Sequence, residues 1–173
     1  MLCLLFLSSI SSANAIAKEA GSNTSCLSAA YRQAAYNYLK EEKFTLAIEN
    51  YEKAAQCDPA LSTATYFNLA IAYYATRNMS GAIASLEKLI AIDPADVEAQ
   101  YNLACLRLYK GDTKKAKLHF EQARNCCDRD PKFRPFIDKG LKFLDQLKKA
   151  DPPTQDLVSF FLAQGLPSIV IGG

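Results

Sequence analysis

The middle of the chain repeats one block of sequence three times. Residues 31–59 align without a gap with residues 66–94, at an offset of 35, and these align with residues 100–128 at a further offset of 34. Blocks of this length are supersecondary units that cannot bury their apolar faces alone, so they must stack on one another. Because stacked units present an extended surface on which other molecules usually bind, the repetition predicts a binding module.

Each block contains two stretches in which apolar residues recur at helical spacing. The short polar segments 41–43, 77–80 and 111–113 separate the two stretches and are expected to turn the chain. Asp-Pro pairs at 58–59 and 93–94 are expected to end the second helix, because proline cannot continue a helix. Alanine recurs in both stretches of every block, where the two helices are expected to approach closely: Ala35, Ala70 and Ala104 opposite Ala47, Ala82 and Ala116.

The recurring alanines, the aromatic residues around them and a closing proline about every 34 residues resemble the tetratricopeptide repeat, a helix–turn–helix family. The resemblance implies an all-α fold, a right-handed α-solenoid of three repeats (28–61, 63–96 and 97–130) within a domain of residues 26–150. Residues 131–150 continue with a helical apolar pattern and resemble the capping helix that closes such arrays. Its lysines are expected to face outward: Lys139, Lys142, Lys148 and Lys149.

The third copy departs from the family pattern in three places. Gln100 and Arg107 stand where the first two copies have tyrosine, and the Asp-Pro pair arrives late, at 130–131. The alanines and Phe120 keep the pattern, so the fold prediction includes this copy.

In this family the first helix of each pair lines the concave side, so the resemblance implies a binding groove there. One face of each predicted first helix carries residues at i, i+4 and i+7 that do not face the helix's own partner. Such a stripe lines either an open groove or the core between repeats, and the sequence leaves both placements open. The stripes are Arg32, Tyr36 and Leu39, then Phe67, Ile71 and Tyr74, then Tyr101, Cys105 and Leu108.

A ladder of amide side chains, Gln33, Asn68 and Asn102, occupies one equivalent position in the three blocks. Family members use asparagine to hydrogen-bond the backbone of an extended peptide; the alternative is three solvated surface amides. A clamp for a C-terminal carboxylate is not expected, because Tyr36, Glu98 and Asn102 stand where such a clamp needs Asn, Lys and Arg. We therefore predict a peptide-binding groove lined by apolar and aromatic side chains.

Composition excludes several classes of function. The chain has 173 residues, half of them hydrophobic, and a net charge of +2 with lysines scattered among acidic residues, so no nucleic-acid partner is expected. The sequence has no glycine-rich phosphate loop, no Ser-His-Asp set and no paired metal-ligand motif. We therefore expect neither a cofactor nor a metal nor enzyme activity, with a thiol-based enzyme as the weakest alternative.

Residues 1–15 predict an export signal peptide. An apolar core over residues 2–7 leads into small residues that end in Ala-Asn-Ala at 13–15, a small-x-small cleavage pattern. The expected location is periplasmic, secreted or envelope-associated. The alternative is a cytoplasmic protein with an apolar N-terminus, because no Lys or Arg precedes the apolar core.

Export would permit a disulfide between Cys26 and Cys57, which begin and end the two helices of the first repeat; two unpaired thiols are the alternative. Cys126 and Cys127 are adjacent, so we expect them to be free or paired with another chain. His119, the only histidine, is expected at the surface.

Residues 151–173 form an apolar tail that is too short to span a bilayer. Within it, residues 154–171 have three alternative placements: docking on their own chain, filling a groove of the same or a neighbouring molecule, or contacting a membrane or partner. The predicted function is a protein–protein interaction adaptor, or scaffold, that binds a peptide or partner segment in the groove. The alternative is a structural subunit of a cell-envelope or membrane assembly, engaged through this tail.

Overall fold

The computed structural model describes residues 27–58 and 63–149. The predicted signal peptide (1–15), Cys26 and the predicted tail (151–173) lie outside the described residues. The chain divides into two compact units, residues 1–61 and 62–173, and each is described by itself.

The described part of the first unit is one helical hairpin. A helix spans residues 27–40, and α2 (Phe44–Cys57) follows after a short turn. Ala35 and Ala47, which were predicted to face each other, are both fully buried. Ser28 is also buried and donates from Oγ to the carbonyl oxygen of Ala54 at 3.1 Å, which joins the first helix to the end of α2.

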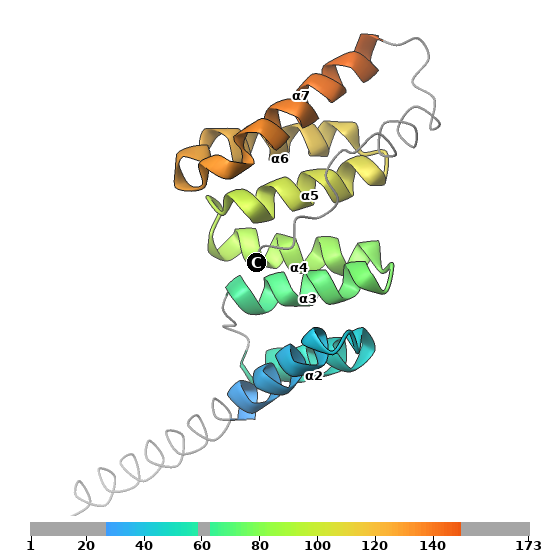
Figure 1. Ribbon diagram of the computed structural model, residues 1–173, viewed down its shortest axis with the longest axis vertical. Coiled ribbons are helices and arrows are strands. Elements are labelled where there is room, and N and C mark those ends of the chain that lie inside the picture. The colour runs from blue at the N-terminus through green and yellow to red at the C-terminus, as the bar shows by residue number, and fades with distance from the viewer. Residues whose placement is uncertain (1–26, 59–62, 150–173) are drawn as a thin grey trace, which may run out of the picture. The chain divides into compact units, whose positions relative to one another are not determined.

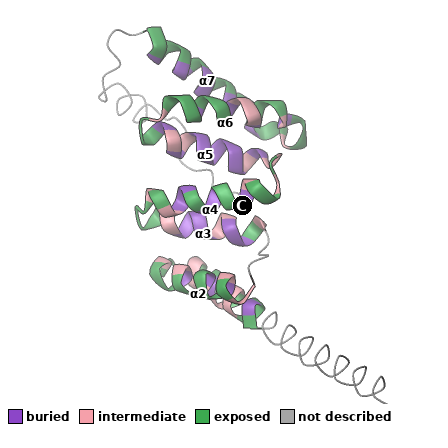
Figure 2. Cartoon of the chain, turned by 180° about the vertical axis from the view of Figure 1, so that it is seen from behind, coloured by how far each residue is buried: buried purple, intermediate pink, exposed green. Residues whose placement is uncertain are grey.

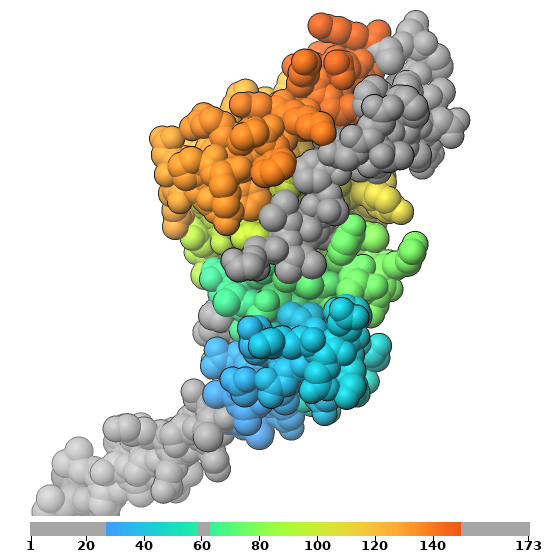
Figure 3. Space-filling model, in the orientation of Figure 1, coloured from blue at the N-terminus to red at the C-terminus, as the bar shows by residue number. Residues whose placement is uncertain are grey.

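The second unit is a succession of two hairpins and a final helix (Figure 1). α3 packs against α4 and α5 against α6; α4–α5 and α6–α7 contacts join the successive layers. Figure 3 shows one face of the chain in space-filling form. This arrangement confirms the predicted all-α fold. The elements are α3 (Thr63–Ala75), α4 (Met79–Ile92), α5 (Val97–Tyr109), α6 (Thr113–Asn125), the 3₁₀ turns η1 (Cys127–Arg129) and η2 (Pro131–Phe133), and α7 (Arg134–Lys149).

The turn inside each hairpin has the same backbone shape. In each turn one residue adopts the left-handed conformation: Glu42 with φ of 57°, Arg77 with 61° and Gly111 with 79°. These positions are separated by 35 and 34 residues, the offsets of the sequence blocks. Of the three, only Gly111 takes this conformation without a steric cost to a side chain. The repetition in the sequence is therefore also a repetition of backbone conformation.

Helix ends in the second unit follow from side-chain caps and Asp-Pro pairs. Asn78 accepts a hydrogen bond at Oδ1 from the Gly81 N–H (2.9 Å), so α4 begins at Met79 and the predicted turn 77–80 is shorter than expected. Asp96 caps α5 in the same way, with the Ala99 N–H at 2.8 Å. α4 ends immediately before Asp93-Pro94, as predicted.

The final helix also begins later than predicted. Pro131–Phe133 forms the 3₁₀ turn η2, and α7 starts at Arg134. One side of α7 is buried and the opposite side exposed (Figure 2). The four lysines predicted to face outward are all exposed. α7 therefore covers the last apolar face of the unit, as a capping helix does.

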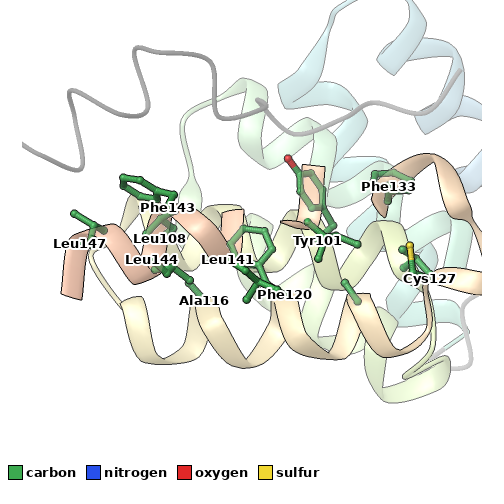
Figure 4. Close-up of a cluster of buried hydrophobic side chains, with 14 residues drawn as sticks. Tyr101, Leu108, Ala116, Phe120, Cys127, Phe133, Leu141, Phe143, Leu144 and Leu147 are labelled. Atoms are coloured by element: carbon green, nitrogen blue, oxygen red, sulfur yellow. The ribbon is translucent and has the colours of Figure 1, made fainter. Parts of the chain in front are cut away.

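A hydrophobic cluster between α5, α6 and α7 forms the core at this end of the unit (Figure 4). Phe120 of α6 is fully buried in it. Gly140 of α7 lies against the Phe120 ring so closely that a Cβ atom at position 140 would be 2.6 Å from Phe120 Cζ. The missing side chain at position 140 is what lets α7 approach α6 at this point.

Gln100 and Arg107, the two residues at which the third repeat lacks the tyrosine of the other copies, make polar contacts instead of aromatic ones. Gln100 is buried; its Nε2 donates to the Pro94 carbonyl oxygen at 2.9 Å, and its Oε1 lies 2.9 Å from His119 Nδ1. Because an amide oxygen can only accept, the hydrogen-bond network assigns a proton to His119 Nδ1. Arg107 forms an ion pair with Glu87 of α4.

His119 is half-buried, and the expectation of a surface histidine was wrong. It was wrong because Gln100 holds the imidazole against α5. Burial lowers the pKa of His119 below its ordinary 6.5; Gln122 and Glu87 act in the opposite direction, whereas Arg107 and Lys115 lower the pKa further.

Replacing Gly140 by alanine should destabilise the second unit by about 1–3 kcal/mol, because the new methyl group overlaps the buried Phe120 ring. At an exposed helical position the same change would stabilise by roughly 1 kcal/mol. Urea unfolding followed by circular dichroism measures the difference. The double variant Gly140→Ala/Phe120→Leu should recover part of the loss; no recovery would show that the Phe120 contact is not the cause.

Stability should also depend on the protonation of His119. A group whose pKa is lower in the folded than in the unfolded chain stabilises the fold above its unfolded pKa, and this contribution is lost as pH falls. The free energy of unfolding should therefore fall as pH is lowered from about 7.5 to about 5.5. His119→Gln keeps an N–H donor for Gln100 and should remove the histidine part of this decline. An unchanged decline in the variant would assign it to other groups.

Candidate functional site

Eight of the predicted groove residues belong to the second unit and occupy four equivalent positions on its two first helices. Within each helix they stand at positions i, i+1, i+4 and i+7, so they share one broad side of that helix. We call this set the first-helix face. Its residues are Phe67, Asn68, Ile71 and Tyr74 on α3, and Tyr101, Asn102, Cys105 and Leu108 on α5.

The α3 residues and the α5 residues of the first-helix face differ in their exposure to solvent. On α3, Phe67, Asn68 and Tyr74 are half-buried, whereas Ile71 is 8% exposed. On α5, three residues are almost fully buried, and only Cys105 retains partial exposure. Among the eight residues of the face, the accessible aromatic surface therefore lies on α3.

Tyr101 and Leu108 belong to the hydrophobic cluster between α5, α6 and α7. Of the two placements that the sequence left open, these two side chains take the core placement. The physical reason is α7, which covers the α5 end of the face as another repeat would.

Tyr101 joins this core to the first-helix face. Its ring centroid lies 5.8 Å from that of Phe120, 5.4 Å from Phe133 and 6.3 Å from Phe136. The hydroxyl group lies at the end of the ring remote from Phe120 (Figure 4), is buried and has no hydrogen-bond partner. Burial, and next the neighbouring Cys105, raise the pKa of Tyr101 well above its usual value, so the hydroxyl stays protonated.

Cys105 lies one helical turn after Tyr101 and borders the same hydroxyl. Burial raises the pKa of its thiol to about 12, while the Tyr101 hydroxyl acts in the opposite direction. The thiol is therefore protonated at neutral pH and is a poor nucleophile. This environment suits packing and polar recognition rather than thiol chemistry.

Phe136 on α7 extends the face, and the sequence did not assign it to the site. It is 40% exposed, although its ring lies beside that of Tyr101. Periodicity placed it among the apolar residues of the capping helix, because a helical pattern does not tell a covered residue from one at the edge of the covered surface. The aromatic pair that it forms with Tyr101 could not be read from spacing.

Three predicted residues lie in the first unit. Arg32 is half-buried, and Tyr36 is 44% exposed with the Lys40 amino group 5.6 Å from its ring centroid. Gln33 is exposed and donates to Asn37 Oδ1 at 3.2 Å. Asn68 and Asn102 of the amide ladder are in the second unit, half-buried and buried respectively. These amides therefore differ in their exposure to solvent.

The cysteines in the described residues carry free thiols: Cys57, Cys105, Cys126 and Cys127. Cys57 is free and half-buried while Cys26 lies outside the described residues, so the pairing of these two stays a prediction. Cys127 is buried and donates from its thiol to the Asp130 carbonyl oxygen at 3.8 Å. Within residues 27–58 and 63–149, no group of His, Cys, Asp or Glu side chains could hold a metal ion, and no helix has the length and apolar character to cross a membrane.

Comparison with protein families gives two matches. Models described as tetratricopeptide repeat match residues 38–103 and residues 97–123. Comparison with the curated proteins finds no match.

Several solved structures have a similar fold. The TPR2B domain of yeast Sti1, in complex with pHsp70, has a TM-score of 0.60 and 21% identity, covering 70% of this chain and 98% of that chain. The Yersinia enterocolitica secretion chaperone SycD, in complex with a peptide of the translocator YopD, has a TM-score of 0.61 and 19% identity over 69% and 92%. The first TPR of Spaghetti (RPAP3), bound to the HSP90 peptide SRMEEVD, has a TM-score of 0.61 and 18% identity over 73% and 96%.

The structure has one helical hairpin in the first unit and two in the second, at the spacing of the three sequence blocks. The family models match residues within the same part of the chain. The closing helix α7 completes the pattern. The chain therefore belongs to the tetratricopeptide-repeat family, with three repeats and a capping helix.

Proposed function

We propose that this protein is an interaction adaptor that binds an uncharged, apolar segment of a partner on the first-helix face of its second unit. The observation that carries the proposal is the accessible aromatic surface on that face. Phe67 and Tyr74 of α3 are half-buried and Phe136 of α7 is exposed, yet none of the eight residues of the face is charged.

Aromatic side chains suit this role because each offers a large apolar area at a small cost in conformational entropy. Partly exposed aromatic residues two turns apart on one helix, as Phe67 and Tyr74 are on α3, can receive different side chains of one extended segment. The half-buried amide of Asn68 lies next to Phe67 on α3 and could meet the main chain of such a segment.

The similar structures support peptide binding as the general mode. The SycD structure contains a peptide of YopD, and the Spaghetti structure contains the HSP90 peptide SRMEEVD. The second of these peptides carries several acidic residues. The first-helix face of this chain has no charged residue, and Glu98 stands beside it on α5. An apolar ligand rather than an acidic one therefore fits this face.

Truncating Phe67 and Tyr74 together to alanine should weaken the binding of selected peptides at least about tenfold, because aromatic anchors carry most of the energy of such interfaces. Peptides are first selected from a random library on the full chain, and their affinity is measured by fluorescence anisotropy. Leu118→Ala is the matched control, since Leu118 is 51% exposed on α6 and outside the face. Equal affinities in wild type and double variant would exclude this face as the site.

The selected peptides should bind without help from their terminal charge. Amidating the C-terminal carboxylate should leave the affinity unchanged, and raising the salt concentration should not weaken it, because charge pairing is not the source of affinity. The same anisotropy measurement at low and high salt checks both points. A loss of affinity on amidation would reveal a carboxylate clamp and contradict the apolar site.

A further inference from the structure

The Tyr101 hydroxyl is an unsatisfied polar group on the first-helix face. The residue is fully buried, its ring is held by Phe120 and Phe133, and its hydroxyl has no hydrogen-bond partner. The neighbouring Cys105 thiol influences the pKa of this hydroxyl, but sulfur is only a weak hydrogen-bonding group. A buried polar group without a partner is costly, so native proteins usually provide one. A main-chain carbonyl oxygen of a bound segment would accept a hydrogen bond from this hydroxyl.

The chain itself contains a segment with the chemistry that this face fits. Residues 154–173 include one charged residue, Asp156, and residues 157–171 are mostly apolar. Two adjacent phenylalanines, Phe160 and Phe161, are suitable partners for the aromatic side chains of the face. Residues 157–171 and the first-helix face are both without charged side chains, so contact between them would leave no buried charge unpaired.

The position of this segment in the chain also favours binding within one molecule. It follows α7, the helix that carries Phe136 and packs beside α5. Residues 154–171 could extend over roughly 60 Å at about 3.3 Å per residue, which is ample to follow a face on α3 and α5 that Phe136 of α7 extends. A short tether gives an effective concentration on the order of millimolar, so weak contacts would suffice.

We infer that residues 154–171 bind the first-helix face of their own chain, with the Tyr101 hydroxyl donating to their backbone, and thereby compete with a partner segment. This inference rests on the proposed function, because it makes the same face an intramolecular regulatory site. A partner would bind after displacing the segment, and its affinity would be reduced by the stability of the closed state.

The test uses the full chain and the reactivity of Cys105, the partly exposed thiol on the face. Phe160→Asp/Phe161→Asp should release the segment, because binding would then bury two charges in an apolar contact. Thr154→Asp/Gln155→Asp is the control variant, since it adds the same charge before the apolar part. Each protein is alkylated with a maleimide, and labelling rates are read by mass spectrometry of peptides. Cys57 in the first unit and Cys126 outside the face are internal references.

Release should accelerate labelling of Cys105 at least about tenfold in the phenylalanine variant, because each buried phenylalanine contributes enough to shift an equilibrium by that factor. The control variant and both reference cysteines should label at the wild-type rate. Equal Cys105 rates in all three proteins would overturn the inference. A rate that falls with protein concentration would also overturn it, since that result assigns the segment to the face of a second copy.

The role of the hydroxyl is tested by Tyr101→Phe in the full chain. If the hydroxyl binds the segment, its loss should raise the Cys105 labelling rate about two- to tenfold, the range expected for one hydrogen bond. If the hydroxyl stays unsatisfied, the variant should label no faster and should be more stable than wild type. That second result would remove Tyr101 from the proposal.

A synthetic peptide of residues 154–173 separates this inference from the proposed function. Added to the Phe160→Asp/Phe161→Asp chain, it should bind and restore slow labelling of Cys105. Failure to bind would overturn the inference alone if library-selected peptides still bind and still depend on Phe67 and Tyr74. If those peptides also lose their dependence on the two residues, the proposed function fails with it.

Discussion

Close approach between helices at positions with little or no side chain is the constraint on which the second unit depends. Within the hairpins, alanines occupy these positions and are almost fully buried, as Ala70 and Ala82 show. Between the last hairpin and the capping helix the same requirement is met by Gly140, whose missing Cβ leaves room for the Phe120 ring. At Gly140 the large residue is supplied by the neighbouring helix, so this contact specifies that α7 faces α6.

Most of this architecture could be predicted from the sequence because it is local and repeated three times. The alanine positions and the left-handed turn residues recur at the same offsets in all three copies, and the Asp-Pro helix ends in the first two, so each copy supports the interpretation of the others. The start of α7 was predicted too early because Pro131 satisfies the rule for a helix start equally well in a 3₁₀ turn. Such boundary differences depend on one or two hydrogen bonds that a periodic pattern does not contain.

The candidate site was less predictable, because the spacing of residues on a helix shows which side they share but not what covers that side. Tyr101 and Phe67 are equivalent in sequence, yet one is buried and the other half-buried. The difference comes from Phe133 of η2 and Phe136 of α7, whose ring centroids lie 5.4 Å and 6.3 Å from that of Tyr101. In the same way, Gln100 and Arg107 read as weakened copies of the family pattern. The structure shows that they exchange aromatic packing for polar contacts with His119 and Glu87, residues 19 and 20 positions away.

Tyr101 shows why core and face cannot be separated in this part of the fold. Its ring packs in the cluster with Phe120 and Phe133, while its hydroxyl lies at the opposite end of the side chain. A ligand that satisfied the hydroxyl would therefore add to the stability of the α5–α6–α7 core, and a core with altered packing would move the hydroxyl. The proposed binding on the first-helix face would thus be coupled to the docking of the capping helix through one side chain. Half-buried Phe67 makes no such contribution to that core, so binding can be altered there without disturbing the fold that presents it.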